Sequence, residues 1–74
     1  MTPTELAQLR IDDAITQKQY DVLLLRSRGL SQHQIAMSLR LARETVRHHE
    51  RAGLRNIDKH RRTNADNQPS ASAA

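Results

Sequence analysis

Basic side chains recur at every fourth position in the second half of the chain, at Arg43, Arg47, Arg51, Arg55 and Lys59. Because each residue of an α-helix turns the chain by about 100°, a spacing of four keeps these groups on one side of a helix. Guanidinium groups bind phosphate oxygens, and their N–H groups can bridge O6 and N7 of guanine. The spacing therefore predicts a surface that binds an anionic polymer without covalent chemistry.

The net charge of +4 is divided unevenly along the 74 residues. Residues 1–25 carry two basic and four acidic side chains, a net charge of −2, whereas residues 26–62 carry ten basic and three acidic, a net charge of +7. This asymmetry favours nucleic acid as the partner, with an anionic membrane surface second. No apolar run approaches the ~20 residues of a membrane span, and no signal-peptide pattern is present. We expect a cytoplasmic, nucleoid-associated protein with no membrane partner.

Other chemistries have little support in the residue types present. The chain has no cysteine and four histidines, of which His48 and His49 are adjacent and would point about 100° apart on a helix. Serine, histidine and aspartate occur without the spacing that activates a nucleophile, and so short a helical chain can scarcely build a pocket. We therefore expect no metal, no cofactor and no enzymatic activity.

The elements that would position the basic side chains are predicted to be short helices. Thr16 and Gln19 form a capping box, and Gly29 favours the left-handed conformation of a helix end, so a helix is expected over about residues 16–28. Thr2 and the proline after it predict a brief helix nearer the N-terminus.

The capping box recurs at Ser31 and Gln34, which predicts a helix over about Gln32–Leu39. The chain must then bend at Arg40–Ala42 and enter another helix, because no proline interrupts residues 43–62. Only residues 29–31 separate the helix over about Gln32–Leu39 from the one expected over about residues 16–28, so the outcome is a set of tightly connected short helices.

These residues fit a helix-turn-helix that begins at Gln32. Its fourth, eighth, tenth and fifteenth places should be apolar and its fifth small, and they hold Ile35, Leu39, Leu41, Val46 and Ala36. Three positions depart from the pattern, namely Arg40 in place of the turn glycine, Ala42 as a poor helix cap, and His49 at an apolar place. We expect Arg40 either to avoid the left-handed conformation or to cost about 1 kcal/mol or more.

The helix after the bend should have two unlike faces. With Val46 as the reference direction, an apolar strip of Gly53, Leu54 and Ile57 falls within about 80°. The opposite side holds Arg47, Arg51, Arg55, Lys59 and Arg62, with Glu44 and His48. One face is thus expected to pack on the domain and the other to present positive charge.

The predicted fold is all-α, a small helix-turn-helix domain of three to four helices with a long C-terminal helix. Residues 1–14 are expected to form an N-terminal helical segment, residues 15–62 the helix-turn-helix domain, and residues 63–74 a disordered tail.

Distance from the start of the last helix suggests a role for each polar side chain on duplex DNA. The predicted base contacts are Arg43, Glu44, Arg47, His48 and Arg51. The predicted phosphate contacts are Ser31, Gln32, Arg40, Thr45, Arg55, Lys59 and Arg62. Two roles stay open for Glu44, because its carboxylate could accept a hydrogen bond from cytosine or restrain Arg47 or His48.

Two segments of the chain resemble a known family. "ITQKQYDVLLLRSRGLSQHQIAMSL" and "ETVRHHERAGLRNIDKHRRT" are similar to the archaeal Tfx family of DNA-binding proteins, and more distantly to LuxR-type and sigma-factor region 4 helix-turn-helix domains. The resemblance implies a transcriptional regulator of double-stranded DNA that uses Arg43 to Arg51 as its recognition helix and acts with the transcription machinery.

Rival functions stay open at this point. The chain could be a protein-interaction adaptor, antitoxin-like or sigma-binding, in which the helix-turn-helix is only a scaffold. RNA binding has less support, because the single aromatic side chain, Tyr20, is expected in the core and offers no stacking platform. A core this small also predicts a homodimer.

Overall fold

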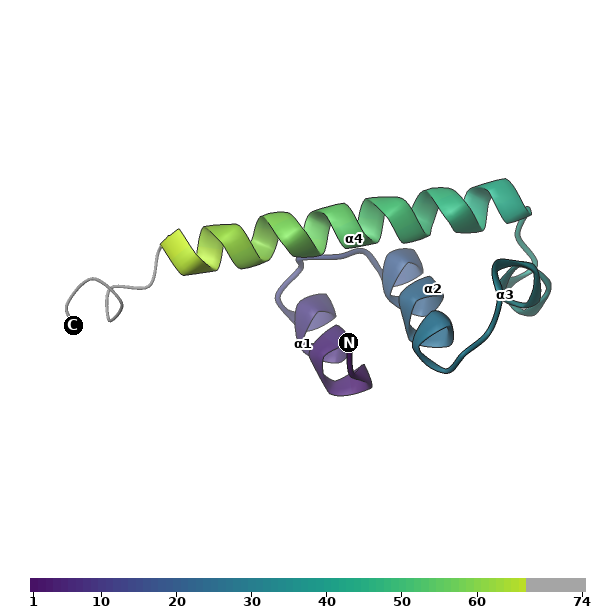
Figure 1. Cartoon of the computed structure of the whole chain (residues 1–74), viewed down its shortest axis with the longest axis horizontal. Helices are drawn as coiled ribbons and strands as arrows, with labels where there is room; N and C mark the ends of the chain where they lie inside the picture. The colour runs from purple at the N-terminus through teal and green to yellow at the C-terminus, as the bar shows by residue number, and fades with distance from the viewer. Residues whose placement is uncertain (67–74) are drawn as a thin grey trace.

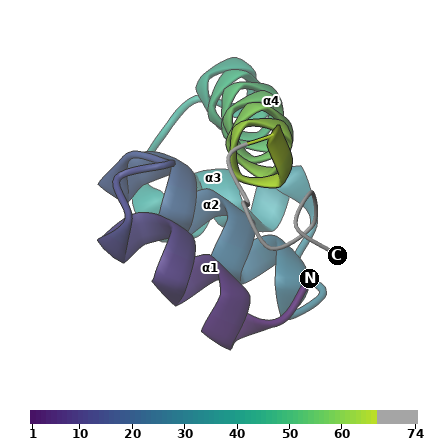
Figure 2. The same cartoon turned by 90° about the vertical axis from the view of Figure 1, so that its left-hand side faces the viewer.

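The computed structural model describes residues 1–66, which form four helices and no strand. The helices are α1 (Pro3–Ile11), α2 (Gln17–Ser27), α3 (Gln32–Leu39) and α4 (Arg43–Asp66). In Figure 1, α1, α2 and α3 lie in a row beneath α4, which runs across them. Figure 2 shows α4 above α1 and α2 from the end of the molecule at which α4 terminates. The predicted all-α fold with a long C-terminal helix is confirmed.

The first three helices all begin with a capping box. In each, the hydroxyl of the capping residue accepts a hydrogen bond of 3.2 Å from the backbone N–H three residues later, and the side chain of that later residue accepts one in return. The pairs are Thr2 with Glu5, Thr16 with Gln19, and Ser31 with Gln34. The second and third pairs were predicted from the sequence. Each box satisfies two backbone donors that a helix start would otherwise leave free.

The same three helices also end alike, in a Schellman motif closed by a left-handed residue. These residues are Asp13 (φ 59°), Gly29 (φ 91°) and Arg40 (φ 57°). In each case the following N–H reaches back five residues, with distances of 2.9 Å from Ala14 to Leu9 O, 3.3 Å from Leu30 to Leu25 O, and 2.9 Å from Leu41 to Ala36 O. Arg40 therefore adopts the conformation that favours glycine, at a cost of about 1–2 kcal/mol.

The core consists of two clusters joined by α2 and α4. The first contains Leu6, Leu9, Ile15, Leu23 and Ile57, and the second contains Val22, Ile35, Ala36 and Val46. Leu39 and Leu41 are partly buried against the second cluster, so the apolar positions predicted for the helix-turn-helix are confirmed. Each buried side chain of this size contributes roughly 1.5–3 kcal/mol.

Gly53, on α4, lies close against the side chains of α2. A Cβ atom at this position would come within 2.9 Å of Leu23 Cδ1 and 3.3 Å of Gln19 Cβ. Because both neighbours are buried, the glycine allows a helix approach that a larger residue would prevent.

Leu54 is not buried, although it was predicted to belong to the apolar strip of α4. Its exposed fraction is 47%, whereas Val46, Gly53 and Ile57 are buried. Leu54 lies at the edge of the strip, about 80° from Val46, and there it lines a shallow hollow beside Met1 rather than packing inside.

The last helix is longer than predicted. α4 continues through Asp66, although a tail was expected from Thr63 onward. The Thr63 hydroxyl donates to Lys59 O at 3.0 Å, and no glycine or proline follows Gly53 before Pro69, so nothing in the sequence stops the helix at residue 62. The rest of the predicted tail, residues 67–74, lies outside the described residues.

Candidate nucleic-acid interface

A row of basic side chains covers the solvent side of α4. We call Arg43, Arg47, Arg51, Arg55, Lys59 and Arg62 the cationic face, and all six are exposed. Val46, Gly53 and Ile57 are buried on the side of the same helix opposite to Arg47, Arg51, Arg55, Lys59 and Arg62. Arg43, in the first turn, lies about 60° from Val46 and is exposed because it stands at the helix start. The cationic face extends for about 28 Å at 1.5 Å per residue.

Most of the cationic face has no compensating charge nearby. Within residues 1–66, the side chains of Arg43, Arg51, Arg55 and Lys59 form no ion pair. Arg62 pairs with Asp58 at 3.0 Å, and Arg47 pairs with Glu44 at 2.6 Å. By contrast, Arg10, Arg26 and Arg61, which lie elsewhere, are each paired with a carboxylate. Lys18, Arg28 and Arg40 also form no ion pair within residues 1–66, so four of the seven unpaired basic side chains of the described structure lie on α4.

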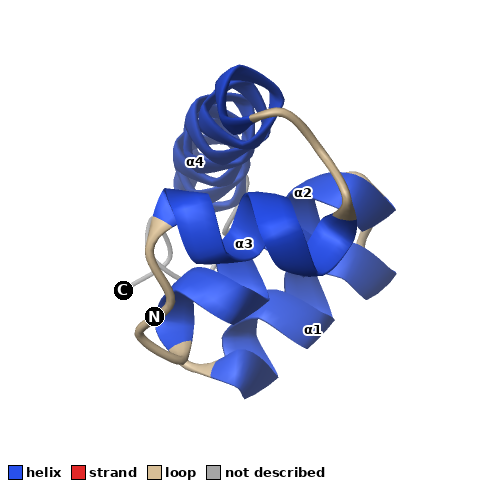
Figure 3. Cartoon of the chain, turned by 90° about the vertical axis from the view of Figure 1, so that its right-hand side faces the viewer, coloured by secondary structure: helices blue, strands red, loops and turns tan. Residues whose placement is uncertain are grey.

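Two shallow hollows lie along the first half of the cationic face. One, of about 250 Å³, is lined by Gln32, Arg43, Glu44 and Arg47. The other, of about 160 Å³, is lined by Glu44, Arg47, His48, Arg51 and Arg55. All five predicted base contacts line one hollow or the other, and the predicted phosphate contacts Gln32 and Arg55 lie beside them. Figure 3 shows α3 beneath the start of α4, which is how Gln32 reaches this site.

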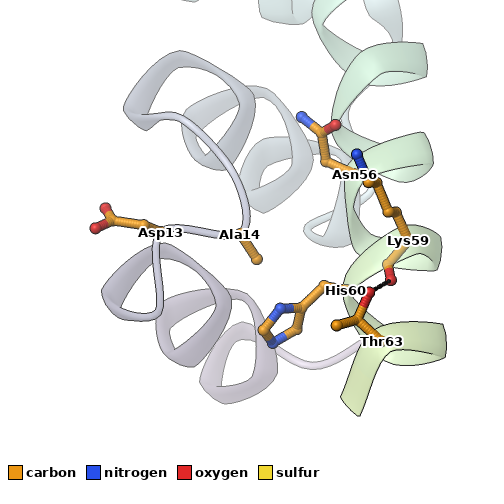
Figure 4. A pocket seen from close by; sticks show the side chains of 6 residues that line it. All are labelled: Asp13, Ala14, Asn56, Lys59, His60 and Thr63. Carbon is orange, nitrogen blue, oxygen red and sulfur yellow. Dashed lines mark hydrogen bonds between the residues drawn. The ribbon is translucent and has the colours of Figure 1, made fainter. Parts of the chain in front are cut away.

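Other predicted contacts lie apart from these hollows. The Ser31 hydroxyl accepts the Gln34 N–H as part of the helix cap, and Thr45 is partly buried on α4. Arg40 is exposed in the turn between α3 and α4. Lys59 lies more than three turns along α4 from Arg47, in a hollow of about 380 Å³ lined by Asp13, Ala14, Asn56, Lys59, His60 and Thr63 (Figure 4).

Glu50 joins the three helices of the helix-turn-helix. Its Oε2 accepts a hydrogen bond of 3.0 Å from Arg26 Nε at the end of α2, and its Oε1 accepts one of 2.9 Å from Gln32 Nε2 at the start of α3. Arg26 Nη1 also donates to Leu30 O in the connection between α2 and α3, at 3.1 Å. The Glu50 side chain is only 15% exposed. Sequence reasoning missed this residue, because its partners lie 24 and 18 positions away.

Sites of other kinds are not seen in the described part of the chain. No group of three histidine, cysteine, aspartate or glutamate side chains among residues 1–66 could hold a metal ion. His48 and His49 meet edge to face, with ring centroids 6.0 Å apart. None of the described helices combines the length and the apolar character needed to cross a membrane.

Comparison with known proteins agrees with this geometry. A family model described as bacterial regulatory proteins of the luxR family matches residues 13–66, more than two thirds of the chain. The chain belongs to this family. It has the helix-turn-helix domain of a family of DNA-binding regulators, with α2, α3 and α4 inside the matched span and α1 before it. No curated protein and no solved structure matches the chain. The narrower resemblance to the archaeal Tfx group stays a prediction.

Proposed function

We propose that this luxR-family protein is a sequence-specific transcriptional regulator whose α4 enters the major groove of double-stranded DNA. The observation that supports this most is the uncompensated charge of Arg43, Arg51, Arg55 and Lys59 along one side of α4. Charges left unpaired in the free protein are available to replace the counterions of DNA phosphates. Among the described residues, no group of three histidine, cysteine, aspartate or glutamate side chains could hold a metal ion beside these arginines and this lysine.

The first turns of α4 are assigned to the bases and its later turns to the backbone. Arg43, Glu44, Arg47, His48 and Arg51 surround the two hollows near α3, at the end of α4 that would enter the groove. A helix of 24 residues is about 36 Å long, so it extends well beyond a groove about 12 Å wide. Arg55, Lys59 and Arg62 would therefore meet flanking phosphates, together with Ser31, Gln32, Arg40 and Thr45 near the groove edge.

The proposal extends to the assembly and its setting. A homodimer on a two-fold DNA site is proposed because the core is small and Leu54, on α4, is 47% exposed. Membership of the archaeal Tfx group, action with the transcription machinery and a nucleoid location belong to the same proposal, and the sequence resemblance is their support.

The salt dependence of duplex binding tests the proposal. The logarithm of the binding constant should fall with the logarithm of salt concentration, with a slope of about −0.9 for each phosphate contact. Arg55→Ala should make this slope about 0.9 shallower and weaken all sequences alike. Arg61→Ala is the matched control. It removes the same charge from the same helix, but Arg61 lies outside the cationic face and is paired with Glu5 of α1.

Two results would count against the proposal. Equal effects of Arg55→Ala and Arg61→Ala on DNA binding would show that the cationic face is not the binding surface. Duplex binding that is absent, or that hardly depends on salt, would favour the alternative of an adaptor whose helix-turn-helix contacts protein.

A further inference from the structure

Glu44 is the one acidic residue that lines the two hollows at the start of α4. Its Oε1 lies 2.6 Å from Arg47 Nη2, and its Oε2 lies 3.3 Å from the same nitrogen. Arg47 lines both hollows as well, so the ion pair lies between them. We propose that Glu44 is a positioning residue that holds the Arg47 guanidinium for reading one base pair, and that Glu44 itself reads no base. This inference rests on the proposed function.

The geometry of the pair leaves Arg47 able to bind a base. Each terminal nitrogen of a guanidinium carries two N–H groups. Nη2 can therefore donate one to Glu44 and use the other, together with Nη1, for a two-bond contact to O6 and N7 of guanine. Within residues 1–66, no other protein group bonds the Arg47 guanidinium.

The ion pair between Glu44 and Arg47 lowers the conformational entropy that Arg47 would lose on binding a base. A free arginine side chain samples many rotamers, and a base contact must order it. A carboxylate one turn away orders the guanidinium before DNA arrives, so less freedom is lost on binding. The side chains are 50% and 75% exposed, so the pair adds little to the stability of the fold, and its effect is on recognition.

The negative charge of Glu44 also acts against indiscriminate binding. It offsets one positive charge in the part of the cationic face that would otherwise attract any phosphate. Of the two roles left open by the sequence, restraint of Arg47 is favoured, because both carboxylate oxygens bond Arg47 and neither bonds His48 in the described structure.

The experiment compares affinities for a preferred duplex, selected from a random pool, with those for duplexes changed at one base pair each. Arg47→Ala should abolish the preference at one base pair, a loss of about 5- to 150-fold. Glu44→Ala should reduce the preference at the same base pair several-fold, leave the other positions unchanged, and strengthen binding to unrelated duplex. Adding Glu44→Ala to Arg47→Ala should cause no further loss of preference, because the two residues act as one unit.

Asp58→Ala is the matched control. It breaks an exposed ion pair with Arg62 on the same helix and removes the same charge, yet Asp58 lines neither hollow and lies about four turns along α4 from Glu44. It should strengthen binding to all duplexes alike and leave every base preference intact. A melting curve for each variant establishes that it is folded.

Each contrary outcome has its own meaning. A loss of preference at a different base pair from that of Arg47→Ala would show that Glu44 reads a base directly, and additive losses would show independent roles; either overturns the inference while DNA binding stands. Absence of duplex binding by the unaltered protein would overturn the proposed function as well.

NMR relaxation of Arg47 Nε in the free protein gives an independent check. Glu44→Ala should increase the motion of this group and Asp58→Ala should not, and unchanged motion in Glu44→Ala would overturn the inference.

Discussion

The Glu50 carboxylate accepts a hydrogen bond of 2.9 Å from the Gln32 side-chain amide, which ties α4 to the first residue of α3. Its second oxygen accepts one of 3.0 Å from Arg26 at the end of α2. A single side chain of α4 thus bonds both α2 and α3. Because the bonds converge on one residue of α4, they help to fix the angle between this helix, which carries the cationic face, and helices α2 and α3.

Replacement of Glu50 should therefore weaken the fold. Glu50→Ala is expected to lower the free energy of unfolding by about 1–2 kcal/mol, since two donors lose a charged acceptor. Chemical denaturation monitored by circular dichroism measures the change. Asp58→Ala, which breaks an exposed pair on the same helix, should cost no more than about 0.5 kcal/mol. Equal losses in the two variants would contradict a special role for Glu50.

Replacement of Arg40 by glycine should have opposite effects on the stability of the fold and on DNA affinity. Arg40 has a φ of 57°, so Arg40→Gly should relieve strain and raise the free energy of unfolding by about 0.5–1 kcal/mol. The melting temperature should then rise by a few degrees. DNA affinity should fall at the same time if Arg40 contacts phosphate, as proposed.

Gly29→Ala is the natural comparison for Arg40→Gly. Gly29 has a φ of 91° at the equivalent place after α2, so a Cβ there should destabilise the protein by about 1 kcal/mol. A stabilising Gly29→Ala, or a destabilising Arg40→Gly, would contradict this account of the two turns.

Replacement of Gly53 should disturb the crossing of α4 over α2. Gly53→Val would force carbon atoms into the space of Leu23 and Gln19, and overpacking of this kind costs about 1–3 kcal/mol. Arg51→Val places the same side chain at an exposed position of the same helix and should change stability far less. Thermal denaturation of both variants provides the test.

The oligomeric state is a further prediction. Within residues 1–66, the nine buried hydrophobic residues make a small core, and the exposed side chain of Leu54 offers apolar surface on α4. We expect a homodimer, with the apparent melting temperature rising with protein concentration. Light scattering that shows a monomer, both free and on DNA, would contradict this expectation.

Much of the fold was predictable because its signals are local. The capping boxes at Thr16 and Ser31 and the glycine at position 29 act over three to five residues, and they placed the boundaries of α2 and α3. The helix-turn-helix positions Ile35 and Val46 follow from fixed spacing in the same way.

The features that were missed depend on distant partners. The bonds of Glu50 join residues 18 and 24 positions apart, and no periodic pattern encodes such pairs. Leu54 lies about 80° from Val46, at the edge of the apolar strip, and an angle of this size does not by itself tell whether the side chain is buried. The exposed side of α4 was predictable in composition, but its division into paired and unpaired cations required the positions of Glu44 and Asp58.

The continuity of α4 has a mechanical consequence. Its far half is held against α1, where Arg61 meets Glu5 at 3.4 Å and Ile57 packs beside Leu6 and Leu9. Arg47 lies 14 residues before Arg61, about 21 Å along the same rod. A tilt of about 5° around the α1 contact would therefore displace the end that we propose reads bases by about 2 Å. Hydrogen bonds to a base tolerate much less than that. The contacts of α4 with α1, outside the luxR-type domain, would therefore help α2 and α3 to hold the opposite end of the helix in place.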